Sequence, residues 1–391
     1  MRVLFTCIAG SGHFHPLVPI ARALQVAGHD IRFASGLALA PQVAAAGFAF
    51  FPTGDDVRAL ALGLPEIDTL PPLAQREVLR RRFFPEILPA DRLPALLALA
   101  EDWPPDLVVS DNYEFAGRVA AESWGIPHAA VQVAHVYTYS ERDILVPALD
   151  MLRASVGLPP DPEAAMLFRY LYLLCEAPQF RPDDEILPPT AQRLRRTLFD
   201  QSGDERLPAW VATLPARPTV FTTLGTFFGR TPGVLAAILA SARDEPLTLI
   251  ATVGRDLDPA DWGPQPENVR VERYIPQSLL LPACAAVVSH CGSGTMYAAL
   301  NHGLPLVNIP IAADQPENAA RCAALGVGVT VGLDERTPAA IRAAVREVLA
   351  NPTYRANAER VRDEIATQPG PEHAAVLLER LAAERRPMVT M

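Results

Sequence analysis

One strand-to-helix junction in the second half of the chain has the residue types that bind phosphate. The apolar residues 286–288 predict the end of a buried strand, and His-Cys-Gly-Ser-Gly-Thr at 290–295 leads into a helix predicted over 295–301. At such a helix start several backbone N–H groups lack partners, and the helix dipole adds about half a positive charge. Glycines at 292 and 294 let an anion approach closely. We therefore predict a phosphate site at 290–295, the alternative being a plain strand-to-helix cap.

A second junction follows along the chain. The strand predicted over 306–309 ends at Pro310, and Asp314 and Gln315 open another predicted helix. In an open parallel sheet ligands bind at the carboxyl ends of the strands, so the two junctions are expected to share one site. Hydrogen-bond donors for a phosphate group, next to an Asp-Gln pair, predict a ligand that is phosphorylated and rich in hydroxyl groups. A nucleotide sugar fits that description. Alone, the Asp-Gln pair would indicate only a helix N-terminus.

This region resembles the donor signature of the UDP-glycosyltransferase-like family. The resemblance rests on Tyr274-Ile275-Pro276-Gln277, on His290-Cys291-Gly292 with Gly294-Thr295, on Gly303-Leu304-Pro305 and on Asp314-Gln315 with Asn318-Ala319, within about 45 residues. Family members have an α/β architecture, the GT-B fold, in which two Rossmann-like, doubly wound parallel-sheet domains face each other across a cleft. They include bacterial enzymes that glycosylate macrolides and other natural products.

The resemblance implies an inverting, metal-independent glycosyltransferase. It implies a nucleotide diphosphate sugar as donor, linked to dTDP or UDP, and an acceptor hydroxyl on a small hydrophobic molecule such as a polyketide, macrolide or flavonoid. No cofactor besides the donor is implied. Two alternatives stay open: a nucleotide-sugar 2-epimerase or hydrolase of the same fold, whose acid and base carboxylates we do not find, and a non-catalytic nucleotide-sugar-binding auxiliary protein.

A histidine after the first predicted strand is the candidate general base. The sequence Gly-His-Phe-His-Pro at 12–16 matches the family's Gly-His-x-x-Pro motif, so the role carries over to His13 and not to His15. Inverting transfer needs a group that takes the proton from the acceptor hydroxyl, and histidine titrates near neutral pH. Asp111, after the strand 107–109, is the candidate carboxylate that orients the imidazole. Its alternative role is to cap the helix near 113, and Glu114 is a second choice.

The predicted donor-binding residues surround the two junctions and three further loops. They are Gly12, Gly225, Thr226, Tyr274, Ile275, Gln277, His290, Gly292, Ser293, Gly294, Thr295, Asp314 and Gln315. Tyr274 stands where plant relatives have a tryptophan that stacks on uracil, and Ala298 where many relatives have a glutamate for the ribose hydroxyls. Because a deoxyribose has fewer hydroxyl groups for that glutamate to bind, we favour a dTDP-sugar as donor, or a loose choice of donor. The Asp-Leu-Asp at 256–258 spells a metal-binding Asp-x-Asp motif, but its Pro- and Gly-rich context predicts a solvated turn.

Composition excludes several partners and chemistries. All 34 basic residues are arginine, so there is no P-loop lysine and no Schiff-base lysine. The net charge of −10, without a basic block, argues against nucleic acid and an anionic membrane surface as partners. Five scattered cysteines without a Cys-x-x-Cys indicate reduced thiols, and no apolar run approaches membrane-spanning length. We expect a cytoplasmic protein, monomeric or homodimeric.

The predicted elements alternate between strand and helix in both halves, which is typical of doubly wound sheets. Strands are predicted at 3–8, 31–34, 48–51, 107–109, 129–133, 220–224, 248–253 and 269–272, and helices at 16–27, 37–46, 113–124, 231–242, 338–350, 354–367 and 372–384. Two long helix-prone segments, 55–103 and 137–196, interrupt the first half. The resemblance implies that such segments line the acceptor pocket, with Phe83, Phe84, Tyr137 and Tyr139 as the acceptor-binding residues. The alternative is a helical bundle that only covers the sheet.

The length of 391 residues predicts two domains, because one core of this size usually splits. Proline and charge cluster over 182–218 and predict the linker between them. We predict an N-terminal acceptor-binding domain over 1–204 and a C-terminal donor-binding domain over 205–365. The resemblance implies that the last helix, within about 366–391, packs back on the N-terminal domain.

Overall fold

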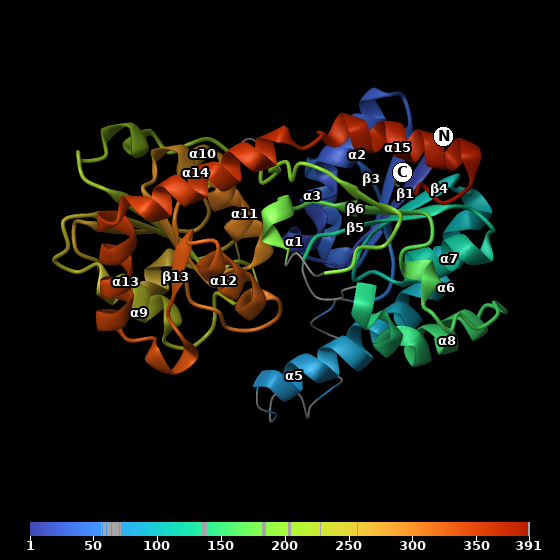
Figure 1. The fold of residues 1–391 in the computed structure, drawn as a ribbon, viewed down its shortest axis with the longest axis horizontal. Coiled ribbons are helices and arrows are strands. Elements are labelled where there is room, and N and C mark those ends of the chain that lie inside the picture. The colour runs from blue at the N-terminus through green and yellow to red at the C-terminus, as the bar shows by residue number, and fades with distance from the viewer. Residues whose placement is uncertain are drawn as a thin grey trace. The chain divides into compact units, whose positions relative to one another are not determined.

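The computed structural model describes residues 1–55, 57, 60, 64, 70, 72–134, 139–181, 185–201, 205–226, 228–255 and 257–389. The chain forms two compact units (Figure 1). The first unit consists of Met1–Glu176, Asp183–Gly203 and Gln368–Met391, and the second of Ala177–Pro182 and Asp204–Thr367. No helix among the described residues is long and apolar enough to cross a membrane.

The first unit is built on a parallel sheet with the strand order β3-β2-β1-β4-β5-β6-β7. The strands are β1 (Arg2–Thr6), β2 (Asp30–Ser35), β3 (Ala49–Pro52), β4 (Leu107–Asp111), β5 (His128–Val131), β6 (Leu171–Leu174) and β7 (Ala191–Arg193). β4, β5 and β6 are buried along their whole length. Such apolar runs are typical of parallel strands that are covered on both faces.

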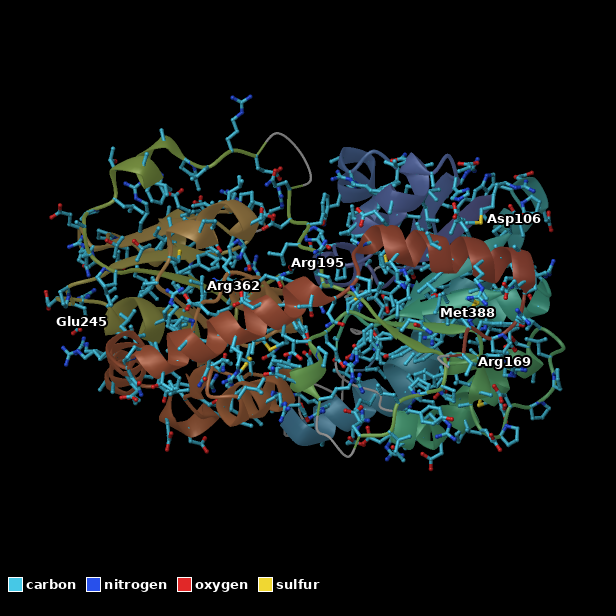
Figure 2. All side chains as sticks on the ribbon, turned by 45° about the horizontal axis from the view of Figure 1, so that its top comes forward. Asp106, Arg169, Arg195, Glu245, Arg362 and Met388 are labelled. Carbon is cyan, nitrogen blue, oxygen red and sulfur yellow. The ribbon has the colours of Figure 1, made fainter. Side chains whose placement is uncertain are left out.

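Helices join these strands and cover the sheet. They are α1 (Ser11–Phe14), α2 (Val18–Val26), α3 (Ala40–Ala45), α5 (Pro72–Val78), α6 (Leu88–Asp102), α7 (Ala116–Ser123), α8 (Val146–Ala154) and α15 (Pro371–Glu384). The last of them, α15, lies along α2 (Figure 1), and His29 Nε2 is 2.8 Å from Glu379 Oε1. The chain end also returns to this sheet, because Met388, labelled in Figure 2, donates its backbone N–H to the carbonyl of Tyr170 at 2.8 Å.

A π-helix, η3 (Leu79–Ile87), leads into α6. Pro85 within it has no N–H to donate, and the N–H of Leu88 bonds to the carbonyl of Phe83, five residues back. The wider turn changes the direction of the side chains that follow. Such π-turns occur often at functional sites, and this one carries Phe83 and Phe84.

The second unit repeats the plan with a parallel sheet in the order β10-β9-β8-β11-β12-β13. The strands are β8 (Thr219–Thr223), β9 (Thr248–Thr252), β10 (Val269–Glu272), β11 (Ala286–Ser289), β12 (Leu306–Asn308) and β13 (Gly328–Thr330). The helices are α9 (Val234–Ser241), α10 (Gln277–Leu280), α11 (Ser293–Asn301), α12 (Gln315–Ala324), α13 (Pro338–Ala350) and α14 (Pro352–Thr367).

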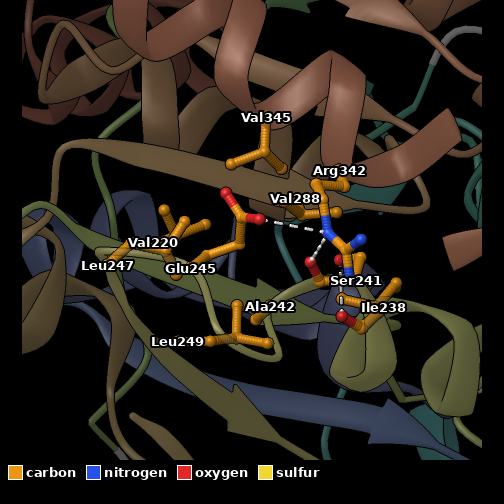
Figure 3. Close-up of a pocket in the computed structure, with 10 residues that line it drawn as sticks. All are labelled: Val220, Ile238, Ser241, Ala242, Glu245, Leu247, Leu249, Val288, Arg342 and Val345. Atoms are coloured by element: carbon orange, nitrogen blue, oxygen red, sulfur yellow. Dashed lines mark hydrogen bonds and ion pairs between the residues drawn. The ribbon is translucent and has the colours of Figure 1, made fainter. Parts of the chain in front are cut away.

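Charged groups tie α9 to α13 on one face of this second sheet (Figure 3). In Figure 3, Arg342 Nε donates to the carbonyl of Ser241 at 2.9 Å and lies 3.2 Å from Oε1 of Glu245. Arg346 donates two hydrogen bonds to the same carboxylate at 2.7 and 2.8 Å. A cavity of about 10 Å³ remains between these groups and the apolar side chains of the sheet, such as Val220 and Val288. It is at the lower limit for one water molecule, so the core here is nearly filled.

The structure corrects the prediction at three strands. The segment 137–196 is not only a helix-prone insertion, because it contributes β6 and β7 to the first sheet. β7 lies within the predicted linker 182–218, and β13 follows α12. Each of the three strands is only three or four residues long. Runs of that length carry too little periodicity to be separated from helix or loop.

Each sheet has one point at which the strand order reverses. In the first unit this point lies between β1 and β4, and in the second between β8 and β11. Loops that leave such neighbouring strands run in opposite directions and open a crevice at the carboxyl ends of the strands. The residues after Thr6, Asp111, Thr223 and Ser289 are therefore the positions where ligands are expected.

Candidate active site

The first unit brings the predicted base and its predicted carboxylate together. β1 leads through a short loop into α1, which carries His13, and the neighbouring strand β4 ends at Asp111. His13 Nδ1 lies 3.1 Å from Asp111 Oδ2. The His13 side chain is 18% exposed and that of Asp111 is completely buried. The imidazole is therefore open to solvent on one side, while the carboxylate is closed off.

Asp111 has both of the roles that the sequence left open. Oδ2 accepts the N–H of Ile8 at 2.8 Å beside His13, and Oδ1 accepts the N–H groups of Tyr113 and Glu114 at 2.7 and 3.0 Å. Burial raises the pKa of Asp111, but the charge of His13 and the hydrogen bonds from His13, Ile8 and Tyr113 outweigh it, so the net pKa lies below its usual value. Asp111 therefore remains ionised near neutral pH. It favours the tautomer in which Nδ1 of His13 carries the proton and Nε2 can accept one.

Glu114, the second-choice partner of His13, has a different role in the structure. Its Oε2 accepts the hydroxyl of Thr6 at 2.6 Å and the N–H of Gly117 at 2.9 Å, and its Oε1 accepts the N–H of Ala116 at 3.0 Å. These bonds cap the first turn of α7 and join it to β1. Both oxygens are thus engaged in holding the fold, which argues against a role beside His13.

A row of aromatic rings leads away from His13. The ring of Tyr113 meets the imidazole edge-on at 5.4 Å between centroids, Phe84 meets Tyr113 at 5.2 Å, and Phe83 meets Phe84 at 5.3 Å. Phe84 is half-buried, whereas Phe83 is only 1% exposed. Phe83 therefore packs against Phe84 from the protein interior. Of these two predicted acceptor residues, only Phe84 is open to contact with an acceptor. Tyr113 is not among the residues predicted from the sequence, although its place two residues after Asp111 puts it at the same strand end.

Of the other predicted acceptor residues, Tyr137 lies outside the described residues. Tyr139 begins the 3₁₀-helix η4 (Tyr139–Leu145) and belongs to a second aromatic cluster. Its ring meets Phe168 edge-on at 5.3 Å, and the guanidinium of Arg142 lies over it at 4.1 Å. Contact of Tyr139 with an acceptor stays a prediction.

In the second unit, the ring of His290 fills the space that two glycines leave. A Cβ atom on Gly292 would lie 2.4 Å from His290 Nε2, and one on Gly225 would lie 2.8 Å from His290 Cε1. Gly225 also has a positive φ of 67°, which glycine adopts without strain. A Cβ on Gly294 would meet no atom within 4 Å. Gly292 is therefore needed for the packing of His290, and Gly294 is the glycine that leaves an open approach to the start of α11.

This difference between the glycines predicts two distinct variants. Gly292→Ala should lower Tm, because the new methyl group collides with the imidazole. Gly294→Ala should leave Tm unchanged or raise it, since alanine is favoured over glycine inside a helix by about 1 kcal/mol, yet it should weaken dTDP binding if phosphate approaches there. Differential scanning fluorimetry with and without dTDP separates the two effects. Equal dTDP affinity of Gly294→Ala and the parent protein would place the anion elsewhere.

His290 is buried in its neutral form. Burial lowers its pKa from 6.5 to about 4, and the nearby Asp314 and the backbone at Thr223 only partly oppose this. Below pH 6.5 the unfolded chain takes up a proton that the folded protein does not, so the free energy of unfolding should fall as the pH drops to about 4, by roughly 3 kcal/mol from this group. Urea unfolding of the parent and of His290→Gln at about pH 7 and pH 4.5 measures this. Identical pH slopes in the two proteins would contradict the prediction.

Hydroxyl groups at the strand ends hold the two loops on either side of His290. Thr223 Oγ1 accepts the N–H of Gly225 at 3.3 Å, and Ser289 Oγ accepts the N–H of Cys291 at 3.1 Å. In both cases the hydroxyl accepts a hydrogen bond from the residue two positions later in the chain. That residue has a positive φ, which is 67° at Gly225 and 63° at Cys291. A non-glycine residue in this conformation is strained and needs such support, and such residues cluster at functional sites.

A buried hydrogen-bond cluster joins the loop after β11 to the loop after β12. Ser293 Oγ donates to Asp314 Oδ2 at 2.6 Å, and Asn318 Nδ2 donates to the same oxygen at 3.0 Å and to the carbonyl of Cys291 at 3.0 Å. The proton of the Ser293 hydroxyl is therefore engaged with Asp314 in this structure. A sugar contact of Asp314 would have to use its Oδ1.

Gln315 also bonds within its own loop. Its Oε1 accepts the N–H groups of Ile311 and Ala312 at 2.7 and 2.9 Å, and the residue is 1% exposed. The predicted contact of Gln315 with the sugar therefore concerns its amide nitrogen alone. The observed bonds shape the turn that presents Asp314.

The remaining predicted donor residues differ in how far their side chains are open. Gly12 and Thr226 are exposed, Tyr274 is half-buried, and Ile275 is 2% exposed, so only the backbone of Ile275 can reach a ligand. Gln277 Nε2 donates to the hydroxyl of Thr295 at 3.2 Å and links α10 to α11. In the predicted turn at 256–258, Asp256 lies outside the described residues, and the exposed Asp258 caps the 3₁₀-helix η8 (Pro259–Trp262).

Two parallel-sheet units, each with polar residues after the neighbouring strands at which its strand order reverses, have the architecture of the GT-B fold. The glycosyltransferase VinC, solved in complex with dTDP, superposes with a TM-score of 0.80 at 27% identity over 98% of this chain and 100% of that one. The spinosyn forosaminyltransferase SpnP superposes with a TM-score of 0.80 at 27% identity over 98% and 99% of the two chains. The predicted fold is thereby confirmed.

The chain belongs to the erythromycin biosynthesis protein CIII-like family, whose N-terminal domain matches residues 22–148 and whose C-terminal domain matches residues 245–381. The L-demethylnoviosyl transferase of Streptomyces niveus is 34% identical over 99% of both chains. The 3-alpha-mycarosylerythronolide B desosaminyl transferase of Saccharopolyspora erythraea is 30% identical over 99% of both. The resemblance seen in the sequence is confirmed, and the protein is a glycosyltransferase.

Proposed function

We propose that this protein transfers a sugar, with inversion and without a metal ion, from a dTDP-sugar to a hydroxyl group of a small hydrophobic natural product. His13 acts as the general base, Asp111 orients it, and residues 290–295 bind the diphosphate. Two relatives support this acceptor class, because the names tylactone mycaminosyltransferase and 3-alpha-mycarosylerythronolide B desosaminyl transferase include their acceptors, tylactone and mycarosylerythronolide B. The complex of VinC with dTDP supports the choice of nucleotide.

The observation that carries the proposal is the contact of 3.1 Å between His13 Nδ1 and the buried Asp111. It leaves Nε2 of a neutral imidazole to take the proton from the acceptor hydroxyl. The acceptor oxygen then forms a bond to C1 of the sugar, the bond from C1 to the phosphate oxygen breaks, and dTDP leaves with the electron pair. Asp111 stabilises the imidazolium that forms.

The predicted donor residues lie in one order along the carboxyl edge of the second sheet. Tyr274 follows β10, Gly225 follows β8, His290 follows β11 and Asp314 follows β12. Neighbouring strands are about 4.8 Å apart, so this edge from β10 to β12 is about 19 Å long. We assign the nucleobase to the Tyr274 end, the diphosphate to the middle and the sugar to the Asp314 end. Backbone N–H groups at the start of α11 and the neutral His290 would then stabilise the leaving group in place of a metal.

The preference for deoxyribose rests on Ala298. It is buried in α11 and supplies no carboxylate for a ribose 2′-hydroxyl. We therefore expect a higher kcat/KM for dTDP-glucose than for UDP-glucose, and we expect that EDTA leaves both values unchanged. A strong UDP preference would contradict the choice of donor, and a loss of activity in EDTA that Mg²⁺ restores would contradict metal independence.

Mass spectrometry with dTDP-glucose and a panel of polyketide, macrolide and flavonoid aglycones tests the reaction itself. The expected product has the mass of the aglycone with one added hexose, and NMR of the purified product should show the opposite anomeric configuration to that in the donor. Conversion or hydrolysis of the nucleotide sugar in the absence of any aglycone, with no transfer to the panel, would favour the epimerase or hydrolase alternative.

A further inference from the structure

An arginine that is not among the predicted donor residues covers one face of the Tyr274 ring, on which we expect the nucleobase to stack. Arg255 lies in the loop after β9, and Tyr274 follows the neighbouring strand β10. The guanidinium carbon of Arg255 is 3.9 Å from the centroid of the Tyr274 ring. Both residues therefore stand at the carboxyl edge of the sheet, at the end that we assign to the nucleobase.

Arg255 has two further polar contacts. Its Nη2 donates to Oε1 of Glu205 at 2.5 Å, and its backbone carbonyl accepts a hydrogen bond from Arg273 at 3.2 Å. The side chain of Glu205 is 19% exposed and that of Arg255 is 46% exposed, so the carboxylate is the more shielded partner of the ion pair. A planar guanidinium fixed in this way stacks on an aromatic ring at little further cost in side-chain entropy.

A tyrosine ring is smaller than the tryptophan of plant relatives and rotates about its χ1 and χ2 torsions unless packing holds it. A cation on one ring face is attracted by the ring quadrupole and fixes the ring plane. A flat partner that stacks on the opposite face then meets a ring whose plane is fixed, and this costs less conformational entropy than stacking on a mobile ring.

We infer that Arg255 is a positioning residue of the donor site, which holds the ring of Tyr274 so that the pyrimidine base of the nucleotide stacks on its opposite face. The inference rests on the proposed function, since it assumes that the protein binds a nucleotide donor. The stack then has three layers, which are the nucleobase, the ring of Tyr274 and the guanidinium of Arg255. The ion pair with Glu205 holds the third layer.

Titration calorimetry of the full-length protein with dTDP tests the inference. Arg255→Ala should raise the Kd for dTDP about fivefold to tenfold. It should leave the weaker binding of inorganic pyrophosphate unchanged, because the stack acts on the base and not on the phosphates. In turnover with dTDP-glucose, the donor KM should rise while kcat stays. Glu205→Gln should have a smaller effect in the same direction.

Two variants control for general effects. Arg270→Ala removes the same charge and a comparable stack, since Arg270 lies 4.2 Å from the ring of Trp210 in the same unit, and it should leave dTDP affinity unchanged. Arg255→Lys keeps the cation and should restore part of the lost affinity, which a merely structural role would not do.

The outcomes separate the inference from the proposed function. If the parent protein binds neither dTDP nor UDP, the proposed function fails. If the parent binds dTDP and Arg255→Ala binds it equally well, the inference alone is overturned. Tighter binding by Arg255→Ala would also overturn it, because Arg255 would then occupy the place of the base. An equal loss of dTDP and pyrophosphate affinity would assign Arg255 to the phosphates instead.

Discussion

Replacement of His13 by alanine is expected to lower kcat by a factor of about 10²–10⁴, the usual contribution of a positioned general base. The donor KM and the Kd for dTDP should change little, because the predicted donor contacts belong mainly to the second unit. The side chain is partly exposed and has one strong polar contact, with Asp111, so a large loss of stability is not expected. Steady-state kinetics with dTDP-glucose, together with calorimetry of dTDP binding, measures both effects.

His15→Ala is the matched control. His15 follows two positions later, and its ring packs edge-on against Phe199 at 5.4 Å instead of facing Asp111. This variant should keep kcat within a small factor. Full activity of His13→Ala, in a sample that still melts cooperatively, would remove His13 as the base and with it the proposed mechanism.

The second large effect is expected for Asp111→Asn. An asparagine can keep one acceptor for the N–H groups of Tyr113 and Glu114, but its NH₂ group then faces the N–H of Ile8 and the imidazole. We expect kcat to fall by about 10²-fold or more, because the productive tautomer of His13 is lost. The variant should also be less stable by about 1–3 kcal/mol, the usual cost of an unpaired buried donor.

The depressed pKa of Asp111 fixes the sign of the pH effect at this site. A carboxylate whose pKa is lower in the folded protein stabilises the fold above its unfolded value of 3.8 and loses that contribution as the pH falls towards its folded pKa. The stability difference between the parent protein and Asp111→Asn should therefore be constant from neutral pH to about pH 5 and shrink below pH 4. Chemical unfolding across this pH range measures it.

Glu114→Gln is the matched control for Asp111→Asn. Glu114 is another buried carboxylate at the same strand end, but it bonds Thr6 and the start of α7 and not His13. The Glu114→Gln variant should be less stable than the parent protein but should retain its kcat. If both variants lost kcat to the same extent, the effect of Asp111 would be a general consequence of disturbing this turn, and its role as the partner of His13 would be wrong.

The donor half of the site could be predicted from the sequence because most of its candidate residues lie in one contiguous stretch. A buried strand, two glycines and a helix start within 286–301 determine locally where backbone N–H groups are exposed. The pattern did not reveal which contact each glycine serves. That Gly225 and Gly292 make room for His290 depends on two loops from neighbouring strands, β8 and β11, whose proximity is a property of the folded sheet.

The aromatic row beside His13 could not be predicted as a unit. Tyr113 comes from the end of β4, whereas Phe84 comes from a π-helix that precedes that strand by some twenty residues. Phe83 and Phe84 were both predicted to bind the acceptor, and only the structure of the π-helix decided that Phe84 faces Tyr113 while Phe83 is buried.

The sequence by itself determined the class of fold, because strands and helices alternate along both halves of the chain. It also predicted the phosphate-binding junction, which depends on residue types over a few neighbouring positions, whereas the pairing of His13 with Asp111 was predicted through the resemblance to a known family. The tertiary structure decided the strand order, which puts Asp111 beside His13 and Arg255 beside Tyr274, residues that lie 98 and 19 positions apart in the chain. The physical reason is that hydrogen bonding between parallel strands sets which strand ends are neighbours, and that choice depends on the packing of the whole sheet.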